Sequence, residues 1–401
     1  MSKVISIPPR PAGEEPKPSP TSSIEEIAAE LAAGRMVVVL DDEDRENEGD
    51  LIMAAEHATP EAVAFMIRHT SGIICVPMEE ERLARLDLPQ MVPANSESYR
   101  TAFTISVDYR YGTTTGVSSA DRAATIRALA NPDSRPSDFA RPGHIFPLRP
   151  RRGGVLVRAG HTEAAVDLCT LAGLKPVGVL CEVMNDDGTM ARRRELEAFA
   201  RQHHLRIGTI ADLIRYRLRN ERSVERIADQ TVQTDLGEFR LCAYRDRVDG
   251  FVHLALTRGR LDGPEVPLVR VHVADTLRDL LGVRGDPRAW TLRAALERIA
   301  RAQNGAVILL REPEPSADLI EALRGLAAQP AGPALPALPA LEGAPAPRPS
   351  IGSRPVLRTY GIGAQILKDL GVRRMRVLSA PKQMHGISAF GLEIESYVDE
   401  A

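Results

Sequence analysis

The 401-residue sequence contains few cysteines: there are four, and no two of them form a C-x-x-C pair. Zinc ribbons and redox sites usually need such a pair, so neither kind of site is expected. Cys75 and Cys181 lie in the apolar runs IICV and VGVLCEV. We therefore predict that they are buried small apolar side chains, as free cysteines usually are.

Aromatic residues are also scarce, at 4% of the chain, and basic residues are not in excess, since 51 Lys and Arg stand against 54 Asp and Glu. Nucleic-acid-binding surfaces need basic patches and often stacking rings, so we expect no nucleic-acid partner. No apolar run approaches the ~20 residues of a membrane span, and the Pro-rich N-terminus lacks the apolar core of a signal peptide. We expect a cytoplasmic protein with no membrane partner and a disordered tail over residues 1–20.

The first half of the chain alternates irregularly between helix and strand signals. Ser23 and Glu26 form a capping box that predicts a helix, and Met36–Leu40 is a β-branched run that predicts a buried strand. Irregular alternation of this kind is typical of layered structure with a mixed sheet. Further helices are predicted from Thr59 and over 121–130, 163–171, 195–204 and 209–219, and further strands over 73–76, 155–157 and 177–183.

The second half begins after a polar, charged stretch, 220–230, which we interpret as a linker. Strands are then predicted over 239–244, 251–256 and 267–273, and a helix over 290–301. Residues 329–349 are rich in Ala, Pro and Gly and favour an extended, flexible segment. Order is expected again from Tyr360. The sequence thus predicts two domains, over 21–219 and 231–401.

The strongest local signal is the acidic segment from Asp41 to Asp50, in which seven of ten residues are carboxylates. A solvated loop is one interpretation. The segment directly follows a predicted buried strand, however, and strand ends open onto ligand sites in layered α/β folds. Hard oxygen ligands of this kind suit Mg²⁺. Both interpretations stay open on the residues alone.

A second signal is the segment Arg158-Ala-Gly-His-Thr162, which lies just before a predicted helix. Small residues allow the backbone to approach a ligand, and the free amides of a helix start favour phosphate. Arg158 can grip a phosphate with two N–H groups, and His161 could bind a metal or move a proton. Glu182, at the end of an apolar strand, is either a satisfied ion pair or a general base. His144 lies among turn residues and is a further candidate.

Six segments, in chain order, resemble 3,4-dihydroxy-2-butanone 4-phosphate synthase: LDDEDRENEGD, RHTSGIICV, TTTGVSSADRAATIRAL, RPGHIFPL, RAGHTEAAVDL and GVLCEVMNDDGTMAR. Together they span about half of the chain. The resemblance implies an α+β chain with an N-terminal three-layer α/β/α domain and a mixed sheet, followed by a second mixed α/β domain.

The resemblance also implies a role for each site residue. Glu46 and His161 would hold divalent metal, Mg²⁺ or Mn²⁺, with two ions per site. Substrate would be bound by Arg45, Glu46, Asp50, Arg158, Ala159, Gly160, His161, Thr162 and Glu182, and His144 and Glu182 would be catalytic.

The implied lyase converts ribulose 5-phosphate to 3,4-dihydroxy-2-butanone 4-phosphate and formate, a step of riboflavin biosynthesis. A base, an electrophilic metal and further acid/base groups suit the proton transfers and the enediolate of such a reaction. The family builds its sites at a dimer interface, so a homodimer is expected.

The second half resembles GTP cyclohydrolase II in VRVH, ending at His272, and in YGIGAQILKDLGV, starting at Tyr360. That family holds zinc with three cysteines, but Asp275 stands at the first position and no cysteine follows Cys242. Val356 replaces the family's Asp before Arg358, and the Ala/Pro stretch replaces its phosphate loop. We therefore expect no zinc and no GTP hydrolysis.

Several roles remain open for this second domain. It could stabilise the chain or the dimer, bind a nucleotide or flavin, or dock a partner enzyme. Arg358 and Lys382 retain some capacity for phosphate. The alternatives for the whole chain are a bifunctional enzyme that also hydrolyses GTP, with zinc on other ligands, and a regulatory scaffold without activity.

Overall fold

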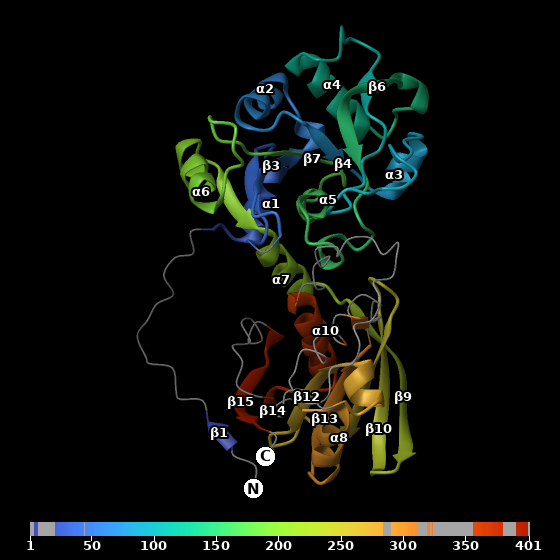
Figure 1. The fold of residues 1–401 in the computed structure, drawn as a ribbon. Coiled ribbons are helices and arrows are strands. Elements are labelled where there is room, and N and C mark those ends of the chain that lie inside the picture. Colours follow the sequence, from blue (N-terminus) through green and yellow to red (C-terminus); the bar gives the residue numbers. More distant parts are fainter. Residues whose placement is uncertain are drawn as a thin grey trace, which may run out of the picture. The chain divides into compact units, whose positions relative to one another are not determined.

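The computed structural model describes residues 4–6, 21–43, 45–283, 290–311, 319–320, 323, 356–379 and 390–399. The chain forms two compact units, one mainly of residues 13–217 and the other mainly of residues 218–348 and 359–401 (Figure 1). The predicted flexible segment 329–349 lies outside the described residues. No helix among the described residues has the length and apolar character needed to cross a bilayer.

The N-terminal unit is built on a seven-stranded mixed sheet with the strand order β5-β6-β4-β7-β3-β2-β8. Its strands are β2 (Val37–Leu40), β3 (Gly49–Ala54), β4 (Cys75–Pro77), β5 (Val107–Tyr109), β6 (Phe139–Leu148), β7 (Gly178–Glu182) and β8 (Arg206–Thr209). Its α-helices are α1 (Ile24–Ala32), α2 (Pro60–His69), α3 (Glu80–Arg85), α4 (Ser119–Ala130), α5 (His161–Leu171), α6 (Arg193–Gln202) and α7 (Ile210–Asn220), the last of which runs into the second unit.

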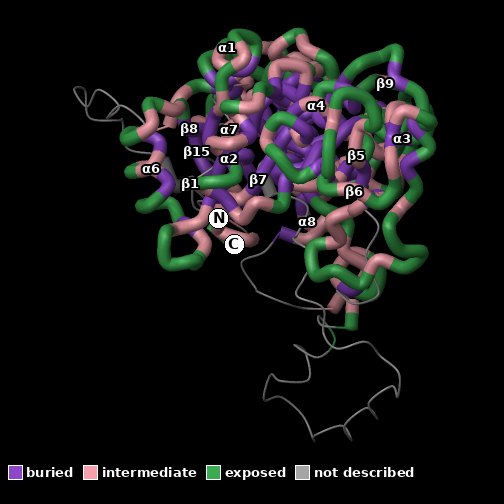
Figure 2. Tube along the Cα trace, turned by 90° about the horizontal axis from the view of Figure 1, so that it is seen from above, coloured by how far each residue is buried: buried purple, intermediate pink, exposed green. Residues whose placement is uncertain are grey.

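Helices cover both faces of this sheet, which confirms the predicted three-layer arrangement. On one face α5 packs so tightly that a side chain at Gly178 of β7 would lie 2.8 Å from Ala165 Cβ. On the other, a side chain at Gly49 of β3 would collide with Leu196 of α6. Since successive residues of a strand point to opposite faces, Asp50 points toward α5. The central strands β2, β3, β4 and β7 are buried along nearly their whole length, as the purple tube around β7 shows (Figure 2).

Local signals in the sequence explain several element boundaries. The Ser23 hydroxyl accepts from Glu26 N at 3.2 Å while Glu26 accepts from Ser23 N at 2.9 Å, so the predicted capping box begins α1. Thr59 caps α2, whose first residue is Pro60, by accepting from Ala62 N at 3.1 Å. All four cysteines are buried and free, as predicted for Cys75 and Cys181.

The second unit contains an eight-stranded mixed sheet with the order β1-β15-β14-β12-β13-β11-β10-β9. Its strands are β1 (Val4–Ser6), β9 (Val224–Thr234), β10 (Gly237–Asp246), β11 (Val252–Arg258), β12 (Leu268–Val273), β13 (Gly305–Leu310), β14 (Arg374–Leu378) and β15 (Glu393–Val398). Helix α10 (Val356–Asp369) contributes Ile362, Ile366 and Leu367 to one buried cluster, and α8 (Leu292–Ala300) contributes Ala295 and Ile299 to another. The predicted α+β class is confirmed for both units.

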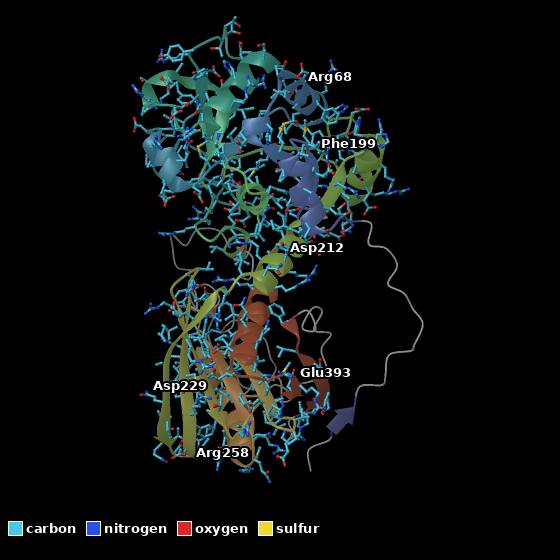
Figure 3. The ribbon with its side chains drawn as sticks, turned by 180° about the vertical axis from the view of Figure 1, so that it is seen from behind. Arg68, Phe199, Asp212, Asp229, Arg258 and Glu393 are labelled. Atoms are coloured by element: carbon cyan, nitrogen blue, oxygen red, sulfur yellow. The ribbon has the colours of Figure 1, made fainter. Side chains whose placement is uncertain are left out.

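The structure differs from three sequence predictions. Val4–Ser6 form β1, antiparallel to β15, within the tail expected to be disordered, because a short extended segment can pair with an open sheet edge. The strand predicted over 155–157 is instead a 3₁₀ turn (Gly154–Leu156), since Gly153 and Gly154 adopt left-handed conformations that bend the chain. The predicted linker 220–230 overlaps β9. This edge strand, which carries Asp229 (Figure 3), has mostly exposed residues and therefore lacks an apolar alternation.

Candidate active site

The acidic loop between β2 and β3 is organised by the first of its carboxylates. Asp41 Oδ1 accepts from Glu48 N at 2.8 Å, and Oδ2 accepts from Glu46 N at 3.1 Å. The Asp41 side chain is fully shielded from solvent. Because its oxygens hold two backbone amides, Asp41 fixes the path of the loop and the position of Glu46.

Arg45 offsets the negative charge that this loop concentrates. Its guanidinium holds both oxygens of Glu46, at 2.7 and 3.0 Å, and donates to Asp41 Oδ2 at 2.9 Å. Burial raises the pKa of Glu46 above its usual value, although Arg45 opposes the shift. Glu46 therefore gains from an additional positive charge beside it.

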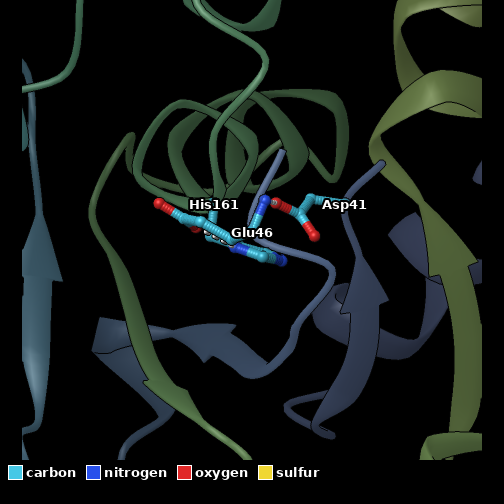
Figure 4. Close-up of side chains that lie close together, drawn as sticks. All are labelled: Asp41, Glu46 and His161. Carbon is cyan, nitrogen blue, oxygen red and sulfur yellow. Dashed lines mark hydrogen bonds and ion pairs between the residues drawn. The ribbon is translucent and has the colours of Figure 1, made fainter. Parts of the chain in front are cut away.

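His161 begins helix α5 and faces the loop (Figure 4). Its Nε2 donates to the backbone carbonyl of Val39 at 3.0 Å. Burial lowers the pKa of His161 to about 4, so that the ring is neutral at pH 7. The hydrogen bond at Nε2 leaves Nδ1 as the nitrogen with a free lone pair, which is the form that binds a metal.

Three acceptor atoms converge at this point. His161 Nδ1 lies 3.9 Å from Glu46 Oε2 and 3.6 Å from Asp50 Oδ1. Asp50 is buried, and its Oδ1 has no hydrogen-bond partner among the described residues. Asp41, Glu46 and His161 also each offer a ligand atom within 4.8 Å of the others. Because none of these atoms donates a proton to another, a cation or a ligand hydroxyl fits between them.

Asp50 and Glu182 lie opposite each other on β3 and β7, so the sheet places two carboxylates beside the metal-ligand candidates. Burial, together with the nearby carboxylates of Glu182 and Glu46, raises the pKa of Asp50 well above its usual value. Glu182 Oε2 accepts from the Ser71 hydroxyl at 2.6 Å. A buried carboxyl beside a second, hydroxyl-bonded carboxylate is a candidate for proton transfer to a bound ligand.

Arg158 lies in the loop before α5 and is held in place by hydrogen bonds to neighbouring residues. The guanidinium donates to Glu163 Oε2 at 2.7 Å, to Thr101 Oγ1 at 3.1 Å, and to the Tyr99 carbonyl from Nε and Nη2 at 3.3 and 3.2 Å. A side chain at Gly160 would lie 2.4 Å from Arg158 Nη1, so only glycine leaves the guanidinium its space. These four hydrogen bonds leave one of the five N–H groups of Arg158 for a ligand.

Ala159, Gly160 and Thr162 complete this segment. Gly160 occupies the N-cap of α5 without a side-chain cap, so amides at the helix start remain available to an anion. Thr162 is buried in the first turn, one residue after His161. Arg158 and the start of α5 thus lie together, and an anion site between them stays a prediction.

His144 stands apart from this cluster. Its Nδ1 lies 2.7 Å from Asp108 Oδ2, and 46% of the side chain is exposed. Phe146 of β6 pairs with Cys75 of β4, which pairs with Leu180 of β7. His144 on β6 and Glu182 on β7 each lie two residues from the row formed by these three residues, toward the same end of the sheet. Because β4 lies between β6 and β7, two interstrand spacings separate His144 from Glu182, which is about 10 Å. Among the described residues, no hydrogen bond or ion pair joins the two side chains.

Sequence reasoning missed several residues that shape the site. Asp41 carried a signal, since it is the first residue after the strand. Ser71 lay in the segment RHTSGIICV without being given a role. Asp108 and Tyr99 carried no signal, because they reach His144 and Arg158 from distant segments. Arg192 carried no signal in the sequence either. It donates to the carbonyls of Glu46 and Asn47 at 2.7 and 2.5 Å.

The second unit offers no comparable metal group among its described residues. His272 Nε2 is held by both oxygens of Asp279, at 3.0 and 2.8 Å. Asp275 caps the short π-helical turn Thr276–Leu280 by accepting from Arg278 N at 2.9 Å. Cys242 is buried within the core of this unit. Among the described residues, His272 Nε2 and the Asp275 carboxylate therefore already have partners within the fold.

Comparisons with known proteins match these two units. The 3,4-dihydroxy-2-butanone 4-phosphate synthase family profile matches residues 25–216, and the GTP cyclohydrolase II profile matches residues 225–399. A 3,4-dihydroxy-2-butanone 4-phosphate synthase of Pseudomonas aeruginosa is 51% identical over 377 residues, covering 94% of this chain and 98% of that protein.

Two further relatives span both units. A bifunctional, chloroplastic riboflavin biosynthesis protein of Arabidopsis thaliana is 48% identical over 93% of this chain and 68% of its own length. The crystal structure of a two-domain 3,4-dihydroxy-2-butanone 4-phosphate synthase from A. baumannii aligns with a TM-score of 0.77 and 41% identity, covering 94% of this chain and 99% of that one.

Proposed function

The chain belongs to the 3,4-dihydroxy-2-butanone 4-phosphate synthase family, and we propose how its residues catalyse the reaction. The enzyme is a lyase of riboflavin biosynthesis. In our proposal the domain over 21–219 converts ribulose 5-phosphate to 3,4-dihydroxy-2-butanone 4-phosphate and formate. The observation that carries it is the convergence of His161 Nδ1, Glu46 Oε2 and Asp50 Oδ1 on one point.

Glu46 and His161 would hold Mg²⁺ or Mn²⁺, with two ions expected in each site. Hard carboxylate oxygens suit both cations. When bound, the metal supplies a Lewis acid that stabilises an enediolate. Arg45, which now holds both oxygens of Glu46, would keep the ligand oriented as the site fills.

The phosphate of the substrate would lie against the start of α5. Arg158 offers its remaining N–H group, and the first amides of the helix add a favourable dipole. Ala159, Gly160 and Thr162 would line this position, and Arg45 would approach it from the acidic loop. Fixed placement of the phosphate orients the far end of the sugar toward the carboxylates of the sheet.

Proton transfers would fall to the acid/base groups of the sheet. Asp50 and Glu182 would bind the sugar hydroxyls, with Glu182 catalytic and oriented by Ser71. His144, whose Nδ1 is held by Asp108, would present its other ring nitrogen, Nε2, for proton transfer. The sheet spreads these groups over several strands, which suits a reaction with successive proton transfers.

A homodimer is part of the proposal. Ile73, Val92 and Val117 are large apolar residues of the N-terminal unit that are between 45 and 49% exposed. Exposed apolar residues of this size are typical of interaction surfaces. Light scattering on the eluting protein should give twice the chain mass of 43.7 kDa.

The second domain would not hydrolyse GTP. His272 and Asp275 are engaged by Asp279 and by the π-helical turn, and the sequence offers no cysteine after Cys242. The near-complete coverage of the Pseudomonas relative, which is named only as a synthase, supports the same view. We propose a structural or regulatory role, with a nucleotide, a flavin or a partner enzyme as the ligand.

The alternative is a bifunctional enzyme in which zinc binds through other ligands. The GTP cyclohydrolase II profile match and the bifunctional Arabidopsis relative favour it. About one zinc per purified chain, together with GTP consumption, would establish this second activity.

The central experiment measures formate released from ribulose 5-phosphate by the full-length protein with Mg²⁺. Formate release that stops with EDTA and in His161→Ala supports the proposal. Folded protein that binds Mg²⁺ but releases no formate would reject it and favour the regulatory scaffold.

A further inference from the structure

The segment from Asn95 to Thr101 forms a closed turn beside the acidic loop. Glu97 accepts from Tyr99 N at 2.9 Å and from Thr101 N at 2.7 Å. Asn95 Nδ2 donates to the Thr101 carbonyl at 2.8 Å, and Asn95 Oδ1 accepts from Glu97 N at 2.9 Å. Side chains of the turn thus hold its own backbone, which gives the residue at its tip, Tyr99, a defined position.

The Tyr99 side chain touches the acidic loop in two ways. Its hydroxyl donates to the Arg45 carbonyl at 3.0 Å, and its ring lies 5.3 Å from the Arg45 guanidinium carbon. A cation over an aromatic face is attracted to it. Tyr99 therefore helps to fix both the backbone and the guanidinium group of Arg45.

The Tyr99 backbone contacts the other arginine of the site. Its carbonyl accepts from Arg158 Nε at 3.3 Å and from Nη2 at 3.2 Å, and Thr101 Oγ1 accepts from Nη2 at 3.1 Å. One residue thus touches Arg45 through its side chain and Arg158 through its main chain. The two arginines come from loops more than a hundred residues apart in the sequence, and Tyr99 lies between them.

We propose that Tyr99 is a positioning residue that sets the spacing and orientation of Arg45 and Arg158, so that both guanidinium groups meet the same phosphate. The inference rests on the proposed function for the identity of the substrate. It adds a third segment, Asn95–Thr101, to the acidic loop and the Arg158–Thr162 segment. Tyr99 itself need not touch the reacting carbons.

The test compares full-length wild type with Tyr99→Leu, which removes the ring and the hydroxyl, and Tyr99→Phe, which keeps the ring. Tyr99→Leu should raise KM for ribulose 5-phosphate about 10-fold and the inhibition constant of inorganic phosphate by a similar factor. Its kcat should stay within about twofold, because the lost interaction serves binding in the ground state and the transition state alike. Tyr99→Phe should rescue most of the loss.

Tyr111→Leu is the matched control, since Tyr111 is 58% exposed and its only ring contact in the described structure is with Tyr109. It should leave both constants unchanged. Mn²⁺ affinity without substrate should also be unchanged in Tyr99→Leu, which separates phosphate positioning from metal binding. An unchanged KM and phosphate constant in folded Tyr99→Leu, or a fall in kcat alone, would overturn the proposal.

Two further measurements separate this inference from the proposed function. If wild type released no formate, the proposed function would fail, while calorimetric titration with inorganic phosphate would still test Tyr99. If Tyr99→Leu did not fold, Thr101→Val removes the Arg158 contact without touching Tyr99. Weaker phosphate binding by Thr101→Val would then support the positioning role, and wild-type binding by this variant would overturn it.

Discussion

At the residue scale, the acidic loop separates carboxylates that hold structure from those that are free to bind. Asp41 holds backbone amides, whereas the Glu46 carboxylate accepts from Arg45 and faces His161. Glu46→Gln removes a ligand charge and should weaken Mn²⁺ binding by at least ~10-fold in a calorimetric titration. Glu43→Gln changes the same charge at an exposed position of the same loop and should have no effect. Equal affinities in the two variants would contradict the assignment of Glu46.

His161 gives the N-terminal unit a specific acid sensitivity. Its folded pKa of about 4 lies below the ordinary value of 6.5, so between these values the unfolded chain binds a proton that the folded chain does not. Acid therefore favours unfolding in this window. Between pH 7 and pH 5 the loss from this group is about 2 kcal/mol.

Urea unfolding of metal-free protein at the two pH values measures this loss. His161→Gln should lose about 2 kcal/mol less than wild type over the same interval, because glutamine does not titrate. A variant with the wild-type pH dependence would show that other groups cause the acid sensitivity.

At the element scale, the start of α6 clamps the acidic loop. Arg192, the N-cap residue of α6, donates to the carbonyls of Glu46 and Asn47, and Asn47 adopts a left-handed conformation (φ 55°) that few residues other than glycine favour. Arg192→Ala should free the loop and weaken Mn²⁺ binding about 10-fold, as loss of residues behind metal ligands commonly does. Arg193→Ala, which removes an exposed arginine paired with Glu197, is the control. Unchanged Mn²⁺ affinity in Arg192→Ala would show that the acidic loop keeps its conformation without Arg192.

The β5–β6 pair shows the same dependence of the site on backbone packing. A Cβ at Gly143 would lie 2.0 Å from Val107 C and 2.3 Å from Asp108 N, so alanine must push the two strands apart. Asp108 holds His144, the next residue along β6. Gly143→Ala should lower the unfolding free energy by ~1–3 kcal/mol and reduce kcat. Full activity and an unchanged melting temperature would show that the strands adapt without cost.

At the scale of the whole molecule, the two units differ in what they can bind. The cluster of three metal-ligand candidates belongs to the N-terminal unit, and in the described part of the second unit His272 is engaged by Asp279. Full-length protein should therefore purify without stoichiometric zinc and should not consume GTP, with or without added Zn²⁺. Metal analysis and a GTP assay check this, and GTP turnover would establish the bifunctional alternative.

The sequence predicted most elements whose signals are local. The capping box of Ser23, the proline that begins α2 and the apolar run of β7 each act over a few residues, so their elements could be read directly. The strand predicted over 155–157 was wrong, and β9 was missed within the predicted linker 220–230, each for a physical reason. Two left-handed glycines override the apolar run in the first case, and an edge strand with mostly exposed residues carries no apolar alternation in the second.

The sequence by itself determined the family, the chemical type of the site and the presence of acidic and RAGHT segments, because these depend on contiguous residues. The tertiary structure alone decided which atoms meet. It turns His161 Nδ1 toward Glu46 and Asp50, pairs Asp50 with Glu182 across two strands, and places Tyr99 against both arginines. Such contacts join segments far apart in the chain, and their geometry is set by strand register and helix packing, which no short stretch of sequence specifies.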